Sequence, residues 1–526
     1  MAIVMLSTLT ASAGGILTNT NQSVNFLRNP ARDAAIGLDG VYSNPAGVAF
    51  LGDGMHLGFN WQYAHQTRTI TGTNELFAMG LKNNGNMTKK FEGVAEAPFV
   101  PSLQAAYNKN DWSFQLNISI PGGGGKCKFD DGIGTFETAV GAISNKLKGT
   151  SDMLNGLISP LGVSVPNVTG YDADGFMKGR QYYIGFQLGA ARKINENLSV
   201  YGGLRLLYGT ASYEARLSNI RVMNGNDGLT LPDYIVGVTK GLSDAKTVLT
   251  TMTNKAVQDH MINDGMTQEV AMQQPDVVAL LTKGQQLQGA AEQVTASGEA
   301  LSPYANGLNL KADQTGWGVA PVIGVDYKTG SFNFAAKYEF KTRMRLKNNS
   351  TLETALIDAT EKFVDGTKVP EDSPALLTLG AQWSVTDQVR LNLGYHHFFD
   401  TDAHWYNHSE DLLDHGSNEY LAGAEWDATK KLQVSGGIQI THYGLTDEYM
   451  NDMSFVVDSW TFGLGIGYQV SDKVKINAAY FQTNYEDYDM NTPEQHMEGF
   501  DLIIPAGKNS FTRTNRVIGL GVELTL

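Results

Sequence analysis

Large apolar side chains alternate with small or polar ones along many segments of this chain. In 460–470, every second residue from Trp460 to Val470 is apolar, and the residues between them are Thr461, Gln469 and glycines. A repeat of two residues is the pattern of a β-strand whose two faces differ. The small, uncharged second face indicates a narrow or wet interior, and the apolar face indicates contact with lipid. The same alternation occurs in 182–190, 317–327, 375–385 and 516–526.

Short polar turns and long connections alternate between the predicted strands. The short turns lie at 108–111, 195–197, 328–330, 386–388, 428–430 and 471–473. The long connections lie at about 66–96, 121–180, 216–315, 346–372, 399–417, 444–457 and 486–510. Short periplasmic turns, long extracellular loops and an even number of strands are typical of outer-membrane barrels. We therefore predict an all-β fold, a 14-stranded antiparallel transmembrane outer-membrane β-barrel with both termini on the periplasmic side.

Two of the long loops, at about 121–180 and 216–315, carry apolar residues at helical spacing. Within them, 136–157, 242–256 and a stretch that begins at Pro275 each place apolar side chains on one face of a helix. We therefore predict helical extracellular loops. Four roles stay open for these helices: capping the barrel mouth, forming a partner surface, binding an apolar ligand, or packing against their own loop.

Composition narrows the classes of function. The net charge of −15 disfavours a nucleic-acid partner, because binding nucleic acid needs a basic face. The single cysteine excludes a disulfide framework and a zinc site built on several thiolates. Only 18% of the residues are charged and 58 are glycine, which fits strands with one face in lipid and glycines facing the lumen.

The first thirteen residues have features of an export signal. They form a short apolar run that ends in Ala11-Ser12-Ala13, the small-x-small pattern of a signal-peptidase site. The first positive charge is Arg28, so the usual basic start is missing, and a buried strand is the alternative. We predict that 1–13 is a signal-peptide remnant, that 14–53 is an N-terminal hatch or plug, and that 54–526 is the barrel.

The segment before the first strand contains a run from Arg28 to Gly37 that includes Arg32, and then Asn44-Pro45-Ala46-Gly47. Small residues followed by Asn-Pro-Ala, just before an amphipathic strand, resemble the hatch of the FadL family. That family comprises outer-membrane transporters of long-chain fatty acids and other hydrophobic compounds, including TodX-type aromatic-hydrocarbon channels. A glycine-rich run, Pro121 followed by Gly122, Gly123, Gly124 and Gly125, also resembles members from the Bacteroidetes.

The resemblance implies a barrel plugged by the hatch, with a hydrophobic ligand captured near the extracellular loops. It also implies a bend in the third strand that opens the wall sideways at Pro121, Gly122, Gly123, Gly124 and Gly125. These residues have a physical reason to bend, because proline lacks an N–H group and glycine favours bulges. The alternative is an ordinary glycine-rich loop at the end of a strand. The last residue, Leu526, departs from the phenylalanine that ends many outer-membrane barrels.

Several cations are candidates for binding a ligand carboxylate. If 331–346 is one strand, Lys337, Lys341 and Arg343 share its lumen face with Glu339. Arg205 and Arg390 also point inward from their strands. These cations either hold a ligand carboxylate or pair with lumenal and hatch acids.

A histidine-rich loop supplies the weak metal candidates, His404 and His408, and keeps a haem or haemin receptor open as an alternative. The default interpretation is an aromatic, polar extracellular loop. An enzyme is disfavoured because no serine-centred elbow or paired-carboxylate spacing accompanies His442 and Asp447.

We therefore predict passive uptake of a hydrophobic small molecule, most of all a long-chain fatty acid, with lateral release through the wall. Uptake of this kind needs no cofactor, because an apolar ligand gains about 25 cal/mol for each Å² of surface that leaves water. The alternatives are a haem receptor, an aromatic-hydrocarbon channel and, behind these, a barrel enzyme or an adhesin. The expected partners are outer-membrane lipid, lipopolysaccharide and the barrel assembly machinery, and the chain is expected to be a monomer.

Overall fold

The computed structural model describes residues 16, 18–302, 305, 307–353, 362–452, 455–497 and 502–526. The predicted signal segment, 1–13, lies outside the described residues. The chain before the barrel contains three short helices, which are α1 (Val24–Arg28), η2 (Leu38–Val41) and η3 (Gly47–Phe50). This segment, which we call the hatch, is buried almost throughout.

Fourteen antiparallel strands form the barrel wall among the described residues, as predicted. Each strand pairs with the next one in the chain, and the last pairs with the first, so the sheet closes. Closure leaves no unpaired edge, which is what a lipid environment demands. The strands are β1 (Gly54–Thr73), β2 (Thr88–Lys109), β3 (Trp112–Phe129), β4 (Gly170–Lys193), β5 (Leu198–Asn224), β7 (Leu308–Thr329), β8 (Phe332–Glu339), β11 (Leu376–Ser384), β12 (Val389–Phe398), β13 (Asn418–Asp427), β14 (Leu432–His442), β15 (Ser459–Ser471), β16 (Val474–Tyr485) and β20 (Gly507–Thr525).

Short strands extend this wall on the side of the long loops. β9 (Arg345–Glu353) pairs with β7 and with β10 (Lys368–Pro370). β17 (Tyr488–Thr492) pairs with β20, and β6 (Asp227–Leu229) with β5. A separate two-stranded ribbon joins β18 (Gln495–Met497) to β19 (Leu502–Ile504).

The two faces of the wall differ as the alternation predicted. Trp460, Leu464 and Ile466 of β15 are exposed on the outside. The glycines between them face the hatch: a Cβ atom on Gly463 would collide with the backbone of Leu27. Small residues on the inner face therefore let the hatch backbone lie directly against the wall.

The strands reach further than the apolar alternation indicated. The first long connection is 74–87 rather than 66–96, and β3 continues to Phe129, so that Pro121 lies inside a strand and not at the start of a loop. The connection after β3 is accordingly 130–169, and the one after β5 is 225–307, although 399–417 matches its prediction. The added parts carry polar residues, which pair through their backbones without needing an apolar face.

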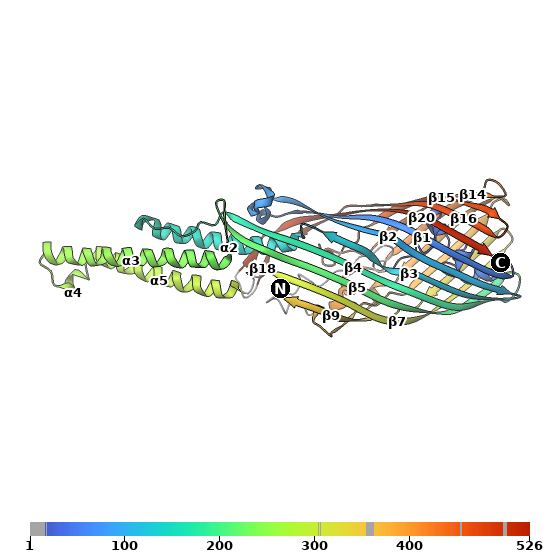
Figure 1. Cartoon of the computed structure of the whole chain (residues 1–526), viewed down its shortest axis with the longest axis horizontal. Helices are drawn as coiled ribbons and strands as arrows, with labels where there is room; N and C mark the ends of the chain where they lie inside the picture. The colour runs from blue at the N-terminus through green and yellow to red at the C-terminus, as the bar shows by residue number, and fades with distance from the viewer. Residues whose placement is uncertain are drawn as a thin grey trace.

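Helices fill the two longest connections, as predicted. They are α2 (Gly134–Ile158), α3 (Leu231–Asn263), α4 (Gln268–Ala271) and α5 (Pro275–Leu301), and Figure 1 shows them beyond the long-loop end of the barrel. Leu242 and Leu249 of α3 are buried in one cluster with Leu287 and Val294 of α5, so the two helices form a hairpin. None of the described helices is both long and apolar enough to cross a membrane. Short 3-10 helices complete the loops: η4 (Glu75–Met79), η5 (Leu81–Asn83), η6 (Ser159–Leu161), η9 (Asp400–Asp402) and η10 (Tyr406–Leu412).

Candidate functional site

The Asn-Pro-Ala-Gly sequence of the hatch joins it to the barrel wall. The Asn44 amide donates to the Asp326 carboxylate on β7 at 2.6 Å, and its carbonyl oxygen accepts from the Gly47 amide at 3.1 Å. A Cβ on Gly47 would press against both Asn44 and Asp326. Asn333 on β8 donates to the same Asp326 oxygen at 2.8 Å. One asparagine therefore both folds the turn and attaches it to the wall.

The two middle residues of this sequence attach the hatch through their backbones. Gln115 on β3 donates to the Pro45 carbonyl at 2.7 Å, and Ser199 on β5 donates to the Ala46 carbonyl at 2.7 Å. The four residues thus contact three wall strands by buried hydrogen bonds. This arrangement makes the turn an anchor of the hatch.

The two hatch arginines belong to a buried charge network. Arg32 bonds to Asp39 at 2.8 Å within the hatch and to Glu425 on β13 at 2.6 Å. Burial alone would lower the pKa of Arg32, but the two carboxylates outweigh burial and raise it. Arg28 donates to Gln433 on β14 at 2.5 Å. Both arginines therefore tie the hatch to the wall.

Arg205 and Lys337 lie on either side of one acidic side chain. The Arg205 guanidinium is paired with Glu339, and the Lys337 ammonium lies 2.7 Å from the other oxygen of the same carboxylate. Lys337 also donates to the Tyr42 carbonyl of the hatch at 2.8 Å. These two cations thus have the pairing with a lumenal acid that was the alternative to ligand binding.

The single strand expected over 331–346 is wrong, and with it the lumenal placement of Arg343. Strand β8 ends at Glu339 and β9 begins at Arg345. In β8 the odd-numbered residues point inward, but after the interruption the even-numbered residues do. Thr342 and Met344 are buried there, whereas Arg343 is exposed. A slip of one residue exchanges the two faces of a strand.

Lys341 and Arg390 also lie apart from the Arg205 group. The Lys341 ammonium donates to the Asp402 carbonyl at 2.6 Å in the loop after β12. Arg390 bonds to Asp427 at 2.8 Å and lies 3.4 Å from Glu425, on the hatch side of the barrel. The five predicted cations therefore do not form one binding site.

The pairing between wall strands β2 and β3 is interrupted at the glycine-rich run that follows Pro121. The ladder between β2 and β3 pairs Glu96 with Lys126 and resumes only at Leu103 and Ile118. Prolines lie on both sides of the interruption, at positions 98 and 101 of β2 and 121 of β3. Because proline cannot donate to a ladder, these residues favour an opening there.

Gly123 occupies a conformation that suits glycine in this interruption. Its φ angle is +83°, and a Cβ atom would collide with the backbone of Gln181 on β4. The β3–β4 register also shifts on either side of 122–124. This glycine therefore fixes the bend of β3.

The hatch is bonded to this bend near its start. Thr18 forms a β-bridge with Gly122. The Asn19 amide donates to the Pro121 carbonyl at 2.9 Å, and its side chain donates to the Gly123 carbonyl at 2.8 Å. Gln22 exchanges two hydrogen bonds with the Ile120 backbone, at 3.1 and 3.0 Å. We call 18–22 the gate segment.

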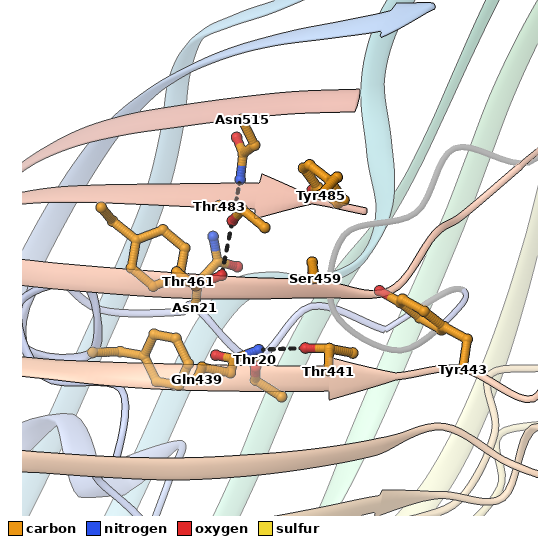
Figure 2. Close-up of a pocket in the computed structure, with 12 residues that line it drawn as sticks. Thr20, Asn21, Gln439, Thr441, Tyr443, Ser459, Thr461, Thr483, Tyr485 and Asn515 are labelled. Carbon is orange, nitrogen blue, oxygen red and sulfur yellow. Dashed lines mark hydrogen bonds between the residues drawn. The ribbon is translucent and has the colours of Figure 1, made fainter. Parts of the chain in front are cut away.

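A small lumenal cavity of about 40 Å³ lies beside the gate segment (Figure 2). Thr20 and Asn21 of the gate segment line it, and the opposite side is made by hydroxyl and amide side chains of β14, β15, β16 and β20. Among the lining residues are the hydrogen-bonded pairs Gln439–Thr441 and Thr461–Thr483. The described residues that line the cavity include no carboxylate, lysine, arginine or histidine side chain; they are neutral polar groups together with Tyr443, Tyr485, Phe26 and Phe481.

Two arginines that sequence reasoning missed face each other near this cavity. Arg68 on β1 is directly opposite Arg513 on β20, and both side chains are buried. Arg68 lies over Phe455 at 5.8 Å, and Arg513 over Tyr485 at 4.9 Å. Residues directly opposite on an antiparallel pair have Cβ atoms about 5 Å apart. Two arginine side chains thus lie side by side in aromatic surroundings.

Comparison with known proteins identifies the fold. No family profile matches this sequence, and no curated protein sequence matches it. A FadL homologue of Pseudomonas aeruginosa matches in structure with a TM-score of 0.57, over 98% of this chain and 99% of its own, at 12% identity. The chain has the FadL fold. The ΔS2S3 mutant of the monoaromatic hydrocarbon channel TodX matches with a TM-score of 0.50, over 96% and 99% of the two chains, at 12% identity.

The FadL fold and the apolar outer face locate the protein in the outer membrane of a Gram-negative bacterium. A second, wider cavity of about 550 Å³ lies at the mouth of this FadL-fold barrel. Its apolar lining includes Phe77 and Met450, which belong to the same buried cluster as Phe455 and Phe511. Apolar contacts therefore run from the mouth to the arginine pair.

The histidine candidates lie in the loop after β12 of the FadL-fold barrel. The rings of His404 and His408 are 4.7 Å apart, and both approach Glu410. Their side chains are 38% and 66% exposed, whereas Trp405 between them belongs to the buried cluster that contains Phe455 and Phe511.

Proposed function

We propose that this protein is a monomeric outer-membrane channel for the passive uptake of hydrophobic small molecules, and that long-chain fatty acids are its substrates. The FadL fold, the hatch that fills the lumen and the apolar cluster below the mouth cavity support this proposal. An apolar tail gains about 25 cal/mol for each Å² of surface that leaves water, so binding in such a cluster needs no energy source.

The facing arginines Arg68 and Arg513 are the reason for proposing a fatty acid as the substrate. Arginine guanidinium groups bind carboxylates through charge-assisted hydrogen bonds, and two of them face each other here across β1 and β20. Phe455 and Phe511, whose ring centres are 4.9 Å apart, supply apolar surface beside the two guanidinium groups. A carboxylate head and an apolar tail both find complementary groups here.

The gate segment supports release of the substrate through the side of the barrel. It lies between the lumenal cavity, which Thr20 and Asn21 line, and the interruption between β2 and β3, to which Asn19 is bonded. Displacement of 18–22 would join the cavity to the interruption. The substrate would then leave the lumen into the bilayer.

An aromatic hydrocarbon is the second candidate substrate, because the cavity beside the gate segment offers neutral and aromatic side chains. TodX, whose ΔS2S3 mutant shares the fold, is a monoaromatic hydrocarbon channel. Such a ligand needs no cation. The two substrates therefore differ in their dependence on Arg68 and Arg513.

Uptake assays distinguish the two substrates. Cells without their own channel for these compounds would express the full chain or the R68Q/R513Q variant, and uptake of radiolabelled oleic acid and of toluene would be measured. We expect oleic acid uptake to fall at least about tenfold in the variant, since hydrogen bonds to charged groups contribute roughly 1.5–3 kcal/mol. Toluene uptake should not change.

The matched control is R180Q/R216Q, which removes two exposed arginines that also lie over aromatic rings. Its oleic acid uptake should equal that of the unmodified protein. Unchanged oleic acid uptake by a folded R68Q/R513Q barrel would overturn the fatty-acid assignment. Uptake of toluene but not oleic acid by the unmodified protein would favour the aromatic-hydrocarbon channel.

A further inference from the structure

Three side chains with metal-binding chemistry converge in the extracellular loop after β12. His404, His408 and Glu410 each offer one ligand atom, and all three atoms lie within 4.8 Å of one another. The cluster is made by a short stretch of η10 and the residues just before it.

The carboxylate at the centre of this cluster is fixed in position. Glu410 is 3% exposed, and its Oε2 atom accepts a hydrogen bond of 3.0 Å from the Trp405 amide. Its other oxygen, Oε1, lies 3.3 Å from His404 Nδ1 and 3.4 Å from His408 Nδ1. A buried, oriented carboxylate thus presents one oxygen atom to two imidazole nitrogens.

These separations fit a tetrahedral metal ion. Zinc is bound at about 2.0–2.1 Å by histidine nitrogen and about 2.0–2.2 Å by carboxylate oxygen, so two ligand atoms of a tetrahedral site lie roughly 3.3–3.5 Å apart. Both measured nitrogen–oxygen distances match that edge. Octahedral sites have shorter edges, about 2.9 Å for the same bond lengths. Two histidines and one glutamate also form a known zinc ligand set.

The surroundings leave room for the rest of the coordination sphere. The His404 and His408 side chains are 38% and 66% exposed, so water has access to the open positions. Asp411 reaches to 3.9 Å from His408 Nδ1 and is a further oxygen donor on the exposed side. A small ion fits this convergence better than a haem, because both nitrogens approach a single carboxylate oxygen.

The geometry points to a binding site for one divalent transition-metal ion of the zinc type, formed by His404, His408 and Glu410. The bound ion would close the loop between 404 and 410 around Trp405. That indole is buried at the barrel mouth and donates to the Asp372 carbonyl at 2.9 Å. Metal binding would therefore stabilise the part of the loop that holds Trp405 in its buried position.

Calorimetric titration of the full-length protein in detergent with Zn²⁺ tests this site. We expect one ion to bind per chain, and the H404Q/H408Q variant to bind at least tenfold more weakly. Co²⁺ should give the visible absorption of a tetrahedral complex in the unmodified protein only. Equal binding by H404Q/H408Q, or no binding by the unmodified protein, would overturn the proposal.

The matched control is H442Q/H496Q, which removes two other exposed histidines that each lie 2.9 Å from a carboxylate. Its Zn²⁺ affinity should be unchanged, and an equal loss in this control would show nonspecific binding to surface histidines. If the H404Q/H408Q variant does not fold, Zn²⁺ binding by the E410Q variant tests the site instead. Its amide oxygen can still accept from Trp405, and it should lose the site; full binding by E410Q would contradict the assignment.

Discussion

The Asn19 side chain donates a hydrogen bond of 2.8 Å to the carbonyl oxygen of Gly123, and this bond joins the hatch to the bend in strand β3. The bond satisfies a backbone acceptor that the interrupted β2–β3 ladder leaves available. The gate segment thus pairs with the part of β3 that β2 leaves unpaired. Opening the wall requires that this replacement be reversible.

A crosslink between the gate segment and the bend should therefore block uptake. Thr18 and Gly122 form a β-bridge, so cysteines at these two positions, in a Cys127→Ser background, are placed to form a disulfide. Under oxidising conditions we expect fatty-acid uptake to be lost, and a reductant should restore it. Each single-cysteine variant should transport normally in both conditions. Full transport by the crosslinked protein would exclude movement of the gate segment.

Replacing Gly123 by alanine should also reduce uptake. Its φ of +83° costs a residue with a Cβ about 1–2 kcal/mol, and the added atom would collide with Gln181. We expect the bend to straighten or shift and fatty-acid uptake to fall several-fold. Gly202→Ala is the matched control, since a Cβ there meets nothing within 4 Å. Equal uptake by both variants would show that the bend is not needed.

Removing Arg32 should loosen the hatch. In Arg32→Met, the carboxylates of Asp39 and Glu425 lose a shared buried partner, a change that typically costs about 3–5 kcal/mol. Hydrogen exchange of the hatch amides should accelerate strongly, and small ions should leak through the barrel in planar bilayers. Arg343→Met, at an exposed position, should leave both measurements unchanged. Unaltered exchange in Arg32→Met would mean that the anchors at Asn44 suffice.

The tip of the helical hairpin should respond to pH. Hydrogen bonds of His260 to Asp264, at 2.6 Å, and to Asp276 of α5, at 3.0 Å, raise the pKa of His260 above its usual value near 6.5. A raised histidine pKa stabilises the folded form below about pH 6.5, and this contribution is lost as the pH rises through the raised value. Amide exchange at the tip should therefore accelerate above that pH. His260→Gln should show no such pH step, and a step that persists would have another origin.

The wall of the barrel was predictable because lipid on one side imposes a repeat of two residues. The ends of the strands were not predictable, since the extracellular part of β1 is mostly polar, that of β3 is rich in glycine, and both pair through their backbones. The one-residue change in the inward-facing positions after Glu339 could not be predicted from the sequence either. Charged residues keep every second position from Lys337 to Arg345, so nothing in the sequence marks the change of face.

The candidate site was only partly accessible from the sequence. The glycine-rich run after Pro121 was visible because its residue types favour a bend, whereas Pro98 and Pro101 gained meaning only as its neighbours on β2. The facing of Arg68 and Arg513 depends on the register between the first and last strands. That register follows from closure of the whole barrel, which no local pattern contains.

A structure of the protein with a fatty acid brominated at its tail tests the proposed function most directly. We predict carboxylate density within hydrogen-bond distance of both Arg68 and Arg513. The anomalous signal of bromine should lie in the cluster around Phe455 and Phe511. A fatty acid whose carboxylate instead contacts Arg205 and Lys337, or one found only outside the lumen, would contradict the account.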